Sequence, residues 1–450
     1  MIALHNLKPA DLSPALDRFF VLAGPKLARL AREWNPTKGA PVFTRRGKYT
    51  SRGWTEWTQG FLYGCRLLYF DATGDEALLE SGRSDTLNYM APHITHTGVH
   101  DHGFNNLSTY GNLRRLAREG RTEDSAELVR LYELALCASG AVQAARWTAT
   151  ADGGGFIHSF NGPQSLFVDT LRSCRILVLA HHLGHVLMGE NDLCISLLDR
   201  AVKHIRATLK YNVYYGKGRD IYDVRGRVAH ESLFNVKDGN YRCPGTQQGY
   251  SPFSTWTRGL AWGLLGCAEQ LEFFQDHPGL LESVEGGRVF LRELREGARA
   301  MADFYLANTP ADGVPYWDTG APGLSRMGDY LDRPAEPDNP YEPVDSSAAA
   351  ISAQGLLRLG SCLGKPGQQY AQAGLSVARA LFAPPYVSEN PHHQGLLLHS
   401  IYHRPNGWDY VPGGAATPRG ESSLWGDYHA LELAVYVKRL IAGTGHLTFY

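Results

Sequence analysis

The stretch HITHTGVHDHGFNN (residues 93–106) gathers side chains that could bind a metal ion or move protons: His93, His96, His100, His102 and Asp101. Zinc needs three or four ligands in a suitable geometry, and two histidines at HxxxH spacing on a helix would supply two of them. Gly98 interrupts that spacing and Pro92 disfavours a continuous helix, so we favour solvated or hydrogen-bonded loop histidines over a metal site. HExxH, cysteine–histidine ligand sets and an EF-hand loop are absent from the sequence.

Asp101 stands between two imidazoles, just before a helix expected to begin near Asn105. A carboxylate flanked by imidazoles at the rim of a cavity can have a depressed pKa and can hold a substrate hydroxyl. The alternative is an aspartate that caps the helix or stabilises a turn, and this residue alone favours that alternative.

A second carboxylate, Asp169, lies in the apolar text SLFVDTLRSCRILVLA. We expect its helix to open at NGPQS, with Pro163 in the first turn and Asp169 about two turns in. Burial would raise the pKa of Asp169 toward the range that a general acid needs. Arg172, on the same helix face, could instead form an internal ion pair that lowers this pKa. Both interpretations remain open.

The run GTQQGYSPFSTWTRGLAWGLL offers a third group of side chains. Arg258 and Trp262 are i,i+4 neighbours on one predicted helix face, and Gln248 lies in the preceding loop. An arginine can bind a sugar carboxylate through two hydrogen bonds while an indole supplies a flat apolar platform. An arginine stacked on a tryptophan inside the protein is an equally good interpretation.

These residues must be positioned by helices, because most of the chain has a 3.6-residue apolar period and strand-like alternation is scarce. Glycine-containing junctions such as YFDATGDEALLESG end one helix and start the next. Roughly a dozen helices in successive hairpins predict an all-α toroid, an (α/α)6 barrel of six inner and six outer helices, with a helical superhelix as the alternative. We expect one domain over residues 1–450. The helices are expected at residues 15–34, 57–70, 125–147, 164–184, 191–209, 255–274, 286–308, 347–364 and 422–441.

Long polar and aromatic loops separate the helices at 93–106, 148–163, 210–252, 309–346 and 385–421. Loops of this length are uncommon unless they are functional. In a toroid they gather at one rim, where we expect the chemistry.

The net charge of −1 gives no general attraction to nucleic acid or to an anionic membrane. The sequence shows no signal peptide and no apolar run of the roughly 18–20 residues that span a membrane. Its seven cysteines are scattered without a CxxC pair, which favours buried free thiols in a reducing, cytoplasmic setting. Neither a GxSxG elbow, nor a P-loop, nor a GxGxxG after a strand is present.

Taken together, several segments resemble the unsaturated glucuronyl hydrolases of glycoside hydrolase family 88, in the order that the family has them. The resembling segments are WTQGFLYGCRLLYFDATGD (57–75), HDHGF (100–104), AARWTA (144–149), FVDTL (167–171), TQQGYSPFSTWTRGLAW (246–262), VPYWD, DSSAAAISAQGLLRL, LLLHSIYHRPNG and SSLWGDYHALE.

The resemblance implies an (α/α)6 barrel that works without a metal or other cofactor. It implies removal of a 4,5-unsaturated uronic acid from the non-reducing end of lyase-generated oligosaccharides, by hydration of the enol ether. Asp169 resembles the general acid/base, and Asp101 resembles the carboxylate that assists it. The positions that match substrate-contacting residues are Trp57, Trp147, His230, Gln248, Arg258, Trp262, Ser400, His403 and Arg404.

The chain departs from the family pattern after Asp169, where Thr170-Leu171-Arg172-Ser173 replaces a Met-Asn-Leu type sequence, and at the basic and aromatic insertion 210–227. Arg172 and the insertion could read a sulfate group, so the expected partner is a carboxylate-bearing oligosaccharide, with or without sulfate. The expected oligomeric state is a monomer or a homodimer. The alternatives are a rhamnogalacturonyl-type hydrolase, an ordinary glycosidase acting on intact uronides, and a non-catalytic sugar-binding toroid.

Overall fold

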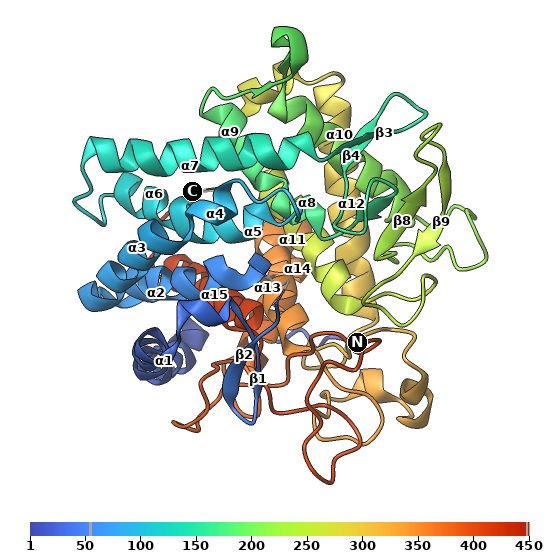
Figure 1. Cartoon of the computed structure of the whole chain (residues 1–450). Coiled ribbons are helices and arrows are strands. Elements are labelled where there is room, and N and C mark those ends of the chain that lie inside the picture. Colours follow the sequence, from blue (N-terminus) through green and yellow to red (C-terminus); the bar gives the residue numbers. More distant parts are fainter. Residues whose placement is uncertain (54–55, 447–448, 450) are drawn as a thin grey trace.

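The structure, a computed structural model, describes residues 1–53, 56–446 and 449. Its helices follow each other as the apolar period predicts (Figure 1). They are α1 Ser13–Glu33, α2 Gln59–Thr73, α3 Glu76–Tyr89, α4 Ala91–Ile94, α5 His102–Asn106, α6 Asn112–Arg118, α7 Ala126–Ala145, α8 Thr170–Ser173, α9 Arg175–His182, α10 Leu197–Tyr211, α11 Thr257–Asp276, α12 Gly287–Ala307, α13 Ser346–Leu363, α14 Gln368–Leu381 and α15 Leu424–Ala442. A π-helical turn, Leu107–Gly111, joins α5 to α6.

Six inner segments close a ring in which each contacts the next: α2, α5 with α6, α8 with α9, α11, α13 and α15, which returns to α2. The outer helices α1, α3, α7, α10, α12 and α14 each pack against inner neighbours. This arrangement is the predicted (α/α)6 barrel.

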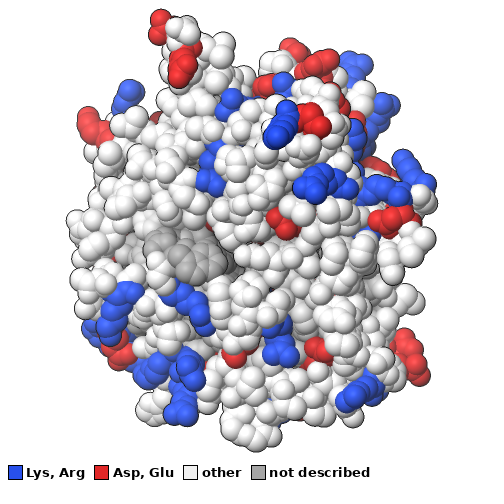
Figure 2. All heavy atoms as spheres, turned by 45° about the vertical axis from the view of Figure 1, so that its right-hand side comes forward, with Lys and Arg blue, Asp and Glu red and all other residues white. Residues whose placement is uncertain are grey.

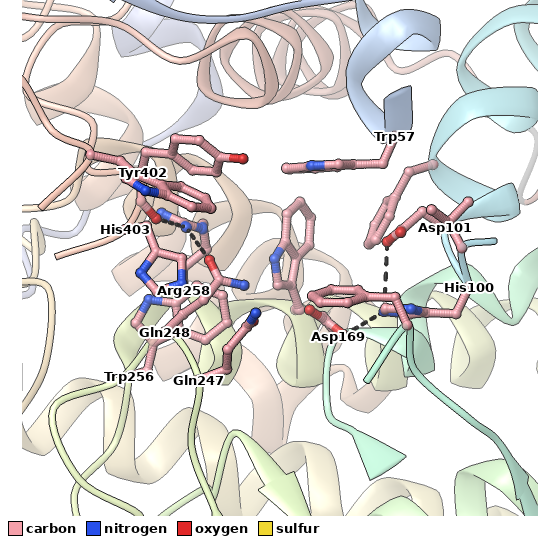
Figure 3. A pocket seen from close by; sticks show the side chains of 15 residues that line it. Trp57, His100, Asp101, Asp169, Gln247, Gln248, Trp256, Arg258, Tyr402 and His403 are labelled. Atoms are coloured by element: carbon pink, nitrogen blue, oxygen red, sulfur yellow. Dashed lines mark hydrogen bonds and ion pairs between the residues drawn. The ribbon is translucent and has the colours of Figure 1, made fainter. Parts of the chain in front are cut away.

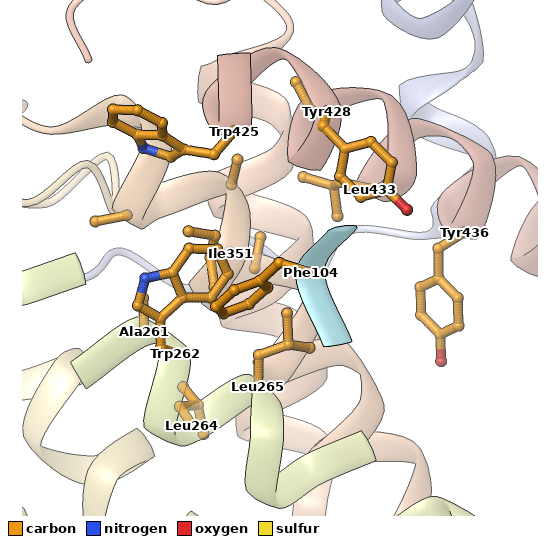
Figure 4. Packing of buried hydrophobic residues seen from close by; sticks show 14 of the residues in the cluster. Phe104, Ala261, Trp262, Leu264, Leu265, Ile351, Trp425, Tyr428, Leu433 and Tyr436 are labelled. Carbon is orange, nitrogen blue, oxygen red and sulfur yellow. The ribbon is translucent and has the colours of Figure 1, made fainter. Parts of the chain in front are cut away.

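Sequence differences between the two rings explain which helices lie inside. The inner helix α13 reads SSAAAISAQGLLRLGSCL and is buried over almost its whole length, whereas the outer α12 buries one stripe and exposes charged residues on the other side. In the middle of the ring, Phe104 of α5 packs with Trp262 of α11 and lies beside residues of α13 and α15 (Figure 4). The inner helices therefore share one apolar centre.

Predicted helix boundaries are confirmed at several junctions. Gly74 ends α2 with a left-handed φ of 77°, and the Asp75 side chain then accepts a hydrogen bond from the backbone N–H of Leu78 at the start of α3. Ser125 and Asp345 cap α7 and α13 in the same way.

Short strands lie in the loops between the helices. They are β1 Pro41–Arg45, β2 Lys48–Ser51, β3 Trp147–Ala149, β4 Gly155–Ile157, β5 Ser165–Phe167, β6 Leu187–Met188, β7 Cys194–Ile195, β8 Glu231–Phe234 and β9 Tyr241–Gly245. They pair antiparallel as β1–β2, β3–β4, β6–β7 and the three-stranded sheet β5–β8–β9.

The expected helix at 164–184 is wrong in its first half. Residues 165–167 form β5, which pairs with β8, and helix begins only at Thr170. A short apolar run fits either state, and here pairing with a distant strand decides it. Asp169 therefore precedes its helix instead of lying two turns inside it. The helix expected at 191–209 likewise begins later, at Leu197.

One apolar cluster extends from Ile2 to Phe449 through both rings. Within the described residues, no helix is both long and apolar enough to cross a membrane. Acidic and basic side chains are interspersed over the face in Figure 2, which agrees with the net charge of −1 and shows no single-sign patch on that face.

Candidate active site

A pocket opens among the loops at one rim of the ring (Figure 3). Its residues come from segments between positions 57 and 408, so the whole ring is needed to build it. They are Trp57, Val99, His100, Asp101, Phe104, Phe160, Asp169, Gln247, Gln248, Trp256, Arg258, Trp262, Tyr402, His403 and Trp408.

The two predicted carboxylates meet in this pocket, and each stands at the N-cap position of a short inner helix. Asp101 precedes α5 and Asp169 precedes α8, yet neither side chain makes a capping hydrogen bond. Both residues are only 7% exposed. An aspartate at an N-cap ordinarily satisfies the first backbone N–H groups of its helix. These two carboxylates are instead turned toward the pocket.

His100 lies between the carboxylates (Figure 3). Its Nε2 is 3.4 Å from Asp169 Oδ1 and 3.7 Å from Asp101 Oδ1. These distances suit ion pairs rather than aligned hydrogen bonds. Within the described residues, neither ring nitrogen of His100 has a hydrogen-bond partner, and neither does Asp169 Oδ1. All three atoms are therefore buried polar atoms whose hydrogen bonds are not satisfied by the part of the chain that the structure describes.

The two carboxyl groups have pKa values shifted in opposite directions. Burial raises the pKa of Asp101, and the neighbouring Asp169 charge adds to this, although His100 opposes it. Burial also acts to raise the pKa of Asp169, but the neighbouring His100 imidazole outweighs it and holds that pKa below its ordinary value. Burial works against the charged form of His100, yet the two aspartates raise its pKa.

The expectation of a depressed pKa for Asp101 is therefore wrong, and for Asp169, where a raised and a lowered pKa had both remained open, the pKa is lowered. The physical reason is that Asp101 lies as deeply buried as Asp169, and the nearer imidazole belongs to Asp169. In the free pocket a proton is held more readily by Asp101 than by Asp169. Because the three groups interact, their titration belongs to the group as a whole.

The predicted ion pair between Asp169 and Arg172 is also wrong. Arg172 is completely buried and points away from the pocket into an internal network, with Nε 3.0 Å from Glu269 and Nη2 2.8 Å from Glu432. It does not line the pocket, so the structure gives no support to its expected contact with substrate.

Arg258 lines the pocket, but its guanidinium is already held by the protein. It pairs with Asp345 at 2.9 Å and donates to the carbonyl of Tyr402 at 2.7 Å and to Gln248 Oε1 at 3.0 Å. Its charge also lies over the rings of Trp256 and Trp425. These contacts make Arg258 an anchor for the loops that form the pocket.

Gln248 lines the pocket, whereas His230 is buried behind it, with its ring packed against Phe167 and Trp256. Since Gln248 Oε1 accepts from Arg258, the amide NH₂ group is the end that remains for the pocket. His230 Nδ1 accepts the backbone N–H groups of Gln247 and Gln248 at 3.0 and 3.3 Å, which puts the ring proton on Nε2. Burial lowers the pKa of His230 to about 4, so the ring is neutral at pH 7.

Aromatic rings form the walls. Trp57 stacks on Trp425 with ring centroids 5.1 Å apart, and Phe104 packs against both Trp57 and Trp262. On the other side, Tyr402 and His403 come from the C-terminal loop (Figure 3). Flat apolar walls beside polar groups suit a sugar ring, whose faces are apolar and whose edge carries hydroxyls.

Asp409 fixes the loop that carries Tyr402 and His403. Its carboxylate accepts both backbone N–H groups, at 2.5 and 3.1 Å. Burial raises the pKa of Asp409 to about 6. The pocket side of this loop is thus held by a carboxylate that titrates in mildly acidic solution.

Besides Arg172 and His230, three other predicted contact residues lie outside the pocket lining. Trp147 is half-buried in β3 beneath the guanidinium of Arg200. Ser400 is buried, with its hydroxyl 3.3 Å from that of Ser346. Arg404 is half-buried on the C-terminal loop, one position after His403.

The insertion 210–227 does not line the pocket either. Its arginines Arg219 and Arg227 both lie over the ring of Tyr214, and Arg225 pairs with Glu296 and Asp303 of α12. These three arginines make contacts within the insertion and with α12. Their placement gives no support to the expectation that they bind a sulfate group of the substrate.

Sequence reasoning did not assign several residues that the structure puts in the lining: Phe104, Phe160, Gln247, Trp256, Tyr402 and Trp408. Gln247, Trp256 and Phe104 adjoin or lie inside the motifs that were singled out, so adjacency was a usable signal. Trp408 directly follows the segment LLLHSIYHRPNG, so the same signal applied to it, whereas Phe160 stands in a loop without periodicity and nothing local marks it.

Two other histidines of the opening stretch, His93 and His102, have hydrogen-bond partners. His102 Nδ1 lies 2.8 Å from the Ser139 hydroxyl and its Nε2 lies 2.8 Å from the His96 carbonyl. Among the described residues, no group of three or more histidine, cysteine, aspartate or glutamate side chains is arranged to hold a metal ion.

Comparison with known proteins gives close agreement over almost the full chain. An unsaturated glucuronyl hydrolase of Bacillus sp. strain GL1 is 28% identical over 88% of this chain and 90% of its own. An unsaturated chondroitin disaccharide hydrolase of Streptococcus pyogenes serotype M1 is 24% identical over 95% of this chain and 91% of its own. No family model matches the chain.

A solved structure shares the fold. The crystal structure of an unsaturated glucuronyl hydrolase specific for heparin has a TM-score of 0.72 with this chain, at 21% identity, and covers 97% of this chain and 99% of its own. With the helical ring and the sequence likeness together, the chain is a glycoside hydrolase with an (α/α)6 barrel that is similar to the unsaturated glucuronyl hydrolases of glycoside hydrolase family 88.

Proposed function

We propose that this enzyme releases a 4,5-unsaturated uronic acid from the non-reducing end of an oligosaccharide, with residues 1–450 acting as one catalytic domain. The observation that carries the proposal is the pair of buried aspartates, each free of helix capping, on either side of His100 in an aromatic pocket. The names of the relatives support the substrate class, because they act on unsaturated glucuronyl and chondroitin disaccharide substrates.

The proposed chemistry is hydration of an enol ether. A proton adds to C4 of the unsaturated sugar, and water adds to C5, losing its own proton to a base. The resulting C5 hemiketal opens as its bond to the ring oxygen breaks. C1 then carries a hemiacetal, which expels the next sugar with its oxygen protonated. One water is consumed, and the proton given to C4 is replaced by the proton taken from water.

We assign Asp169 as the general acid/base and Asp101 as the carboxylate that assists it. Two carboxyl groups with pKa values moved apart are a common arrangement for proton transfer at one centre. In the free pocket the proton is held more readily by Asp101, while His100 keeps Asp169 ionised. Asp101 then holds the proton in the free enzyme. Asp169 transfers a proton to C4 of the substrate and accepts one from the attacking water.

Binding of the sugar is assigned to the walls and the neutral donors of the pocket. Trp57 and Trp262 supply apolar faces, and the amide of Gln248 and His403 lie opposite the two carboxylates (Figure 3). The Arg258 charge attracts the uronate carboxylate without direct contact being required, since its N–H groups already hold Asp345 and the Tyr402 carbonyl.

The decisive experiment follows the ultraviolet absorbance of the conjugated double bond with lyase-generated disaccharides, both sulfated and unsulfated. The wild-type enzyme is expected to remove this absorbance, and Asp169→Asn to lose about 10²- to 10⁴-fold in kcat. Asp312→Asn serves as a matched control, because Asp312 is a partly buried carboxylate engaged with Val314, Ala335 and Tyr386 outside the pocket.

Each alternative predicts another outcome. Release of sugar from intact, saturated uronides without loss of absorbance would indicate an ordinary glycosidase. Activity restricted to unsaturated rhamnogalacturonyl substrates would move the enzyme to that related specificity. Binding of the disaccharides without turnover would indicate a sugar-binding protein and would overturn the proposal.

A further inference from the structure

The segment that follows Asp169 differs from the family pattern, and one of its residues has no part in the proposed chemistry. Ser173, the last residue of α8, is completely buried and lies four positions after Asp169. Its hydroxyl donates to the carbonyl of His100 at 2.8 Å and accepts the backbone N–H of Gly103 at 3.0 Å. It therefore bonds to the backbone on both sides of Asp101.

Other contacts close the same junction. Arg175 at the start of α9 donates to the carbonyl of Gly103 at 3.4 Å, and the Gln143 side chain of α7 lies 3.2 Å from the Ser173 hydroxyl. A β-carbon built on Gly103 would lie 2.0 Å from the Ser173 carbonyl oxygen, so the two backbones meet with no spare room. Only glycine permits this approach.

The helix pair that carries Ser173 is itself held rigidly. Arg172 and Arg175 both pair with Glu269 of α11, and Arg172 reaches Glu432 of α15. All four side chains are buried. A buried network whose charges are all paired resists displacement, because separating any pair leaves a charge without compensation. The hydroxyl of Ser173 is thus a fixed point to which the Asp101 segment is attached.

We propose that Ser173 is a positioning residue that sets the spacing of Asp101 and His100 from Asp169. This inference rests on the proposed function for its activity readout, but the geometry is independent of it. The two carboxylates belong to different segments, residues 100–103 and 169–173, and Ser173 is a direct hydrogen-bonded link between them. Loss of the link would let His100 and Asp101 move relative to Asp169.

The test is Ser173→Ala, which removes the hydroxyl without adding volume. A displacement near 1 Å at a reacting centre costs about 10²-fold in rate, so we expect kcat to fall by roughly 10- to 100-fold with KM changed little. The pH profile of kcat/KM should also shift, because the distances from His100 set both carboxyl pKa values. Ser388→Ala is the matched control, since Ser388 is equally buried and its hydroxyl accepts from Lys26 at 2.7 Å.

A double-mutant cycle separates positioning from a general loss of stability. In an Asp101→Asn background, Ser173→Ala should cost little further activity, because its target is already disabled, while its effect on thermal unfolding should persist. An unchanged kcat and pH profile in Ser173→Ala, or an equal loss of activity in both backgrounds, would overturn the inference.

A readout without turnover keeps the two proposals distinct. Carboxyl carbon NMR, assigned with Asp101→Asn and Asp169→Asn, follows the titration of both groups in the free enzyme. Ser173→Ala is expected to shift the titration of Asp101, and an unshifted titration would contradict the inference. If the wild-type enzyme does not act on unsaturated uronides, the proposed function fails, and the NMR titration still decides the role of Ser173.

Discussion

Buried aspartates of the inner ring can be compared at two places: Asp101 and Asp169 at the pocket, and Asp71 near the far end of α2. The cations beside these two sites differ. α2 begins beside the pocket, next to Trp57, and ends near Asp71; with a rise of about 1.5 Å per residue the two lie roughly 20 Å apart. Asp71 is surrounded by arginines, with Arg115 and Arg439 each at 2.8 Å. Among the described residues, the ion pairs of Asp101 and Asp169 are with one imidazole, that of His100, at the longer distances of 3.7 and 3.4 Å.

The difference shows in their titration. Burial would raise the pKa of Asp71, but Arg115 and Arg439 outweigh it and lower that pKa. Asp71 thus stays ionised and serves stability. In the pocket the partner is a histidine, which can lose its own proton, so the local charge is adjustable. The type of cation beside a buried aspartate therefore separates a structural carboxylate from one able to exchange a proton.

The largest expected effect comes from replacing an aspartate with asparagine, in one variant at the pocket and in another near the far end of α2. Asp101→Asn should lower kcat on unsaturated disaccharides by about 10²- to 10⁴-fold while the protein remains folded. Asp71→Asn should leave KM and kcat near wild type but destabilise the fold, because it leaves buried arginines short of a partner. Steady-state kinetics and chemical denaturation of both variants check this, and a reversed pattern would break the comparison.

Arg172 gives the next largest effect, and it distinguishes the sequence-based expectation from the structure. Because Arg172 pairs with Glu269 and Glu432 inside the protein, Arg172→Met should cost about 3–5 kcal/mol of unfolding free energy. KM for sulfated and unsulfated disaccharides should change alike. A selective rise of KM for the sulfated substrate, with stability unchanged, would show that Arg172 contacts substrate after all.

The pH dependence of stability should have opposite slopes at the two ends. The pKa of Asp101 is raised in the folded protein above its ordinary 3.8, so its contribution to stability is present at low pH and is lost as the pH rises through the folded value. The pKa of Asp71 is lowered, so its contribution is present above 3.8 and is lost as the pH falls.

The measurement is a denaturation series between pH 3 and pH 7. Relative to wild type, Asp101→Asn should gain stability as the pH rises, whereas Asp71→Asn should lose stability over the same range. Parallel curves for the two variants would contradict the assignment of the two pKa shifts.

Much of the fold, and the identity of the two aspartates in the pocket, could be predicted from the sequence. The helical period and the glycine junctions predicted the ring, and both aspartates were recognised as the carboxylates of interest. What failed depended on distant partners: strand β5 exists because β8 pairs with it, and Arg172 faces Glu269 and Glu432, which stand about a hundred and more than two hundred positions later. Local spacing carries no information on such partners. The direction of the two carboxyl pKa shifts could not be derived for the same reason, because it depends on burial and on which aspartate lies nearer to His100.

The smallest expected effect concerns Trp147. Since this ring lies outside the pocket lining, Trp147→Phe should change KM by less than about twofold, whereas Trp57→Leu should raise it by roughly fivefold or more through loss of a stacking face. Equal effects on KM would place Trp147 in contact with the substrate.

The stacking of Trp57 on Trp425 has a consequence for biosynthesis. These two rings, 5.1 Å apart, belong to segments near opposite ends of the chain, and the buried Trp425 backs the Trp57 wall of the pocket when α15 closes the ring against α2. A ribosome has to release almost the entire polypeptide before this wall exists. The nascent chain can already hold Asp101 and Asp169 and still be unable to enclose a sugar, so catalytic competence arrives late in translation, with the last helix.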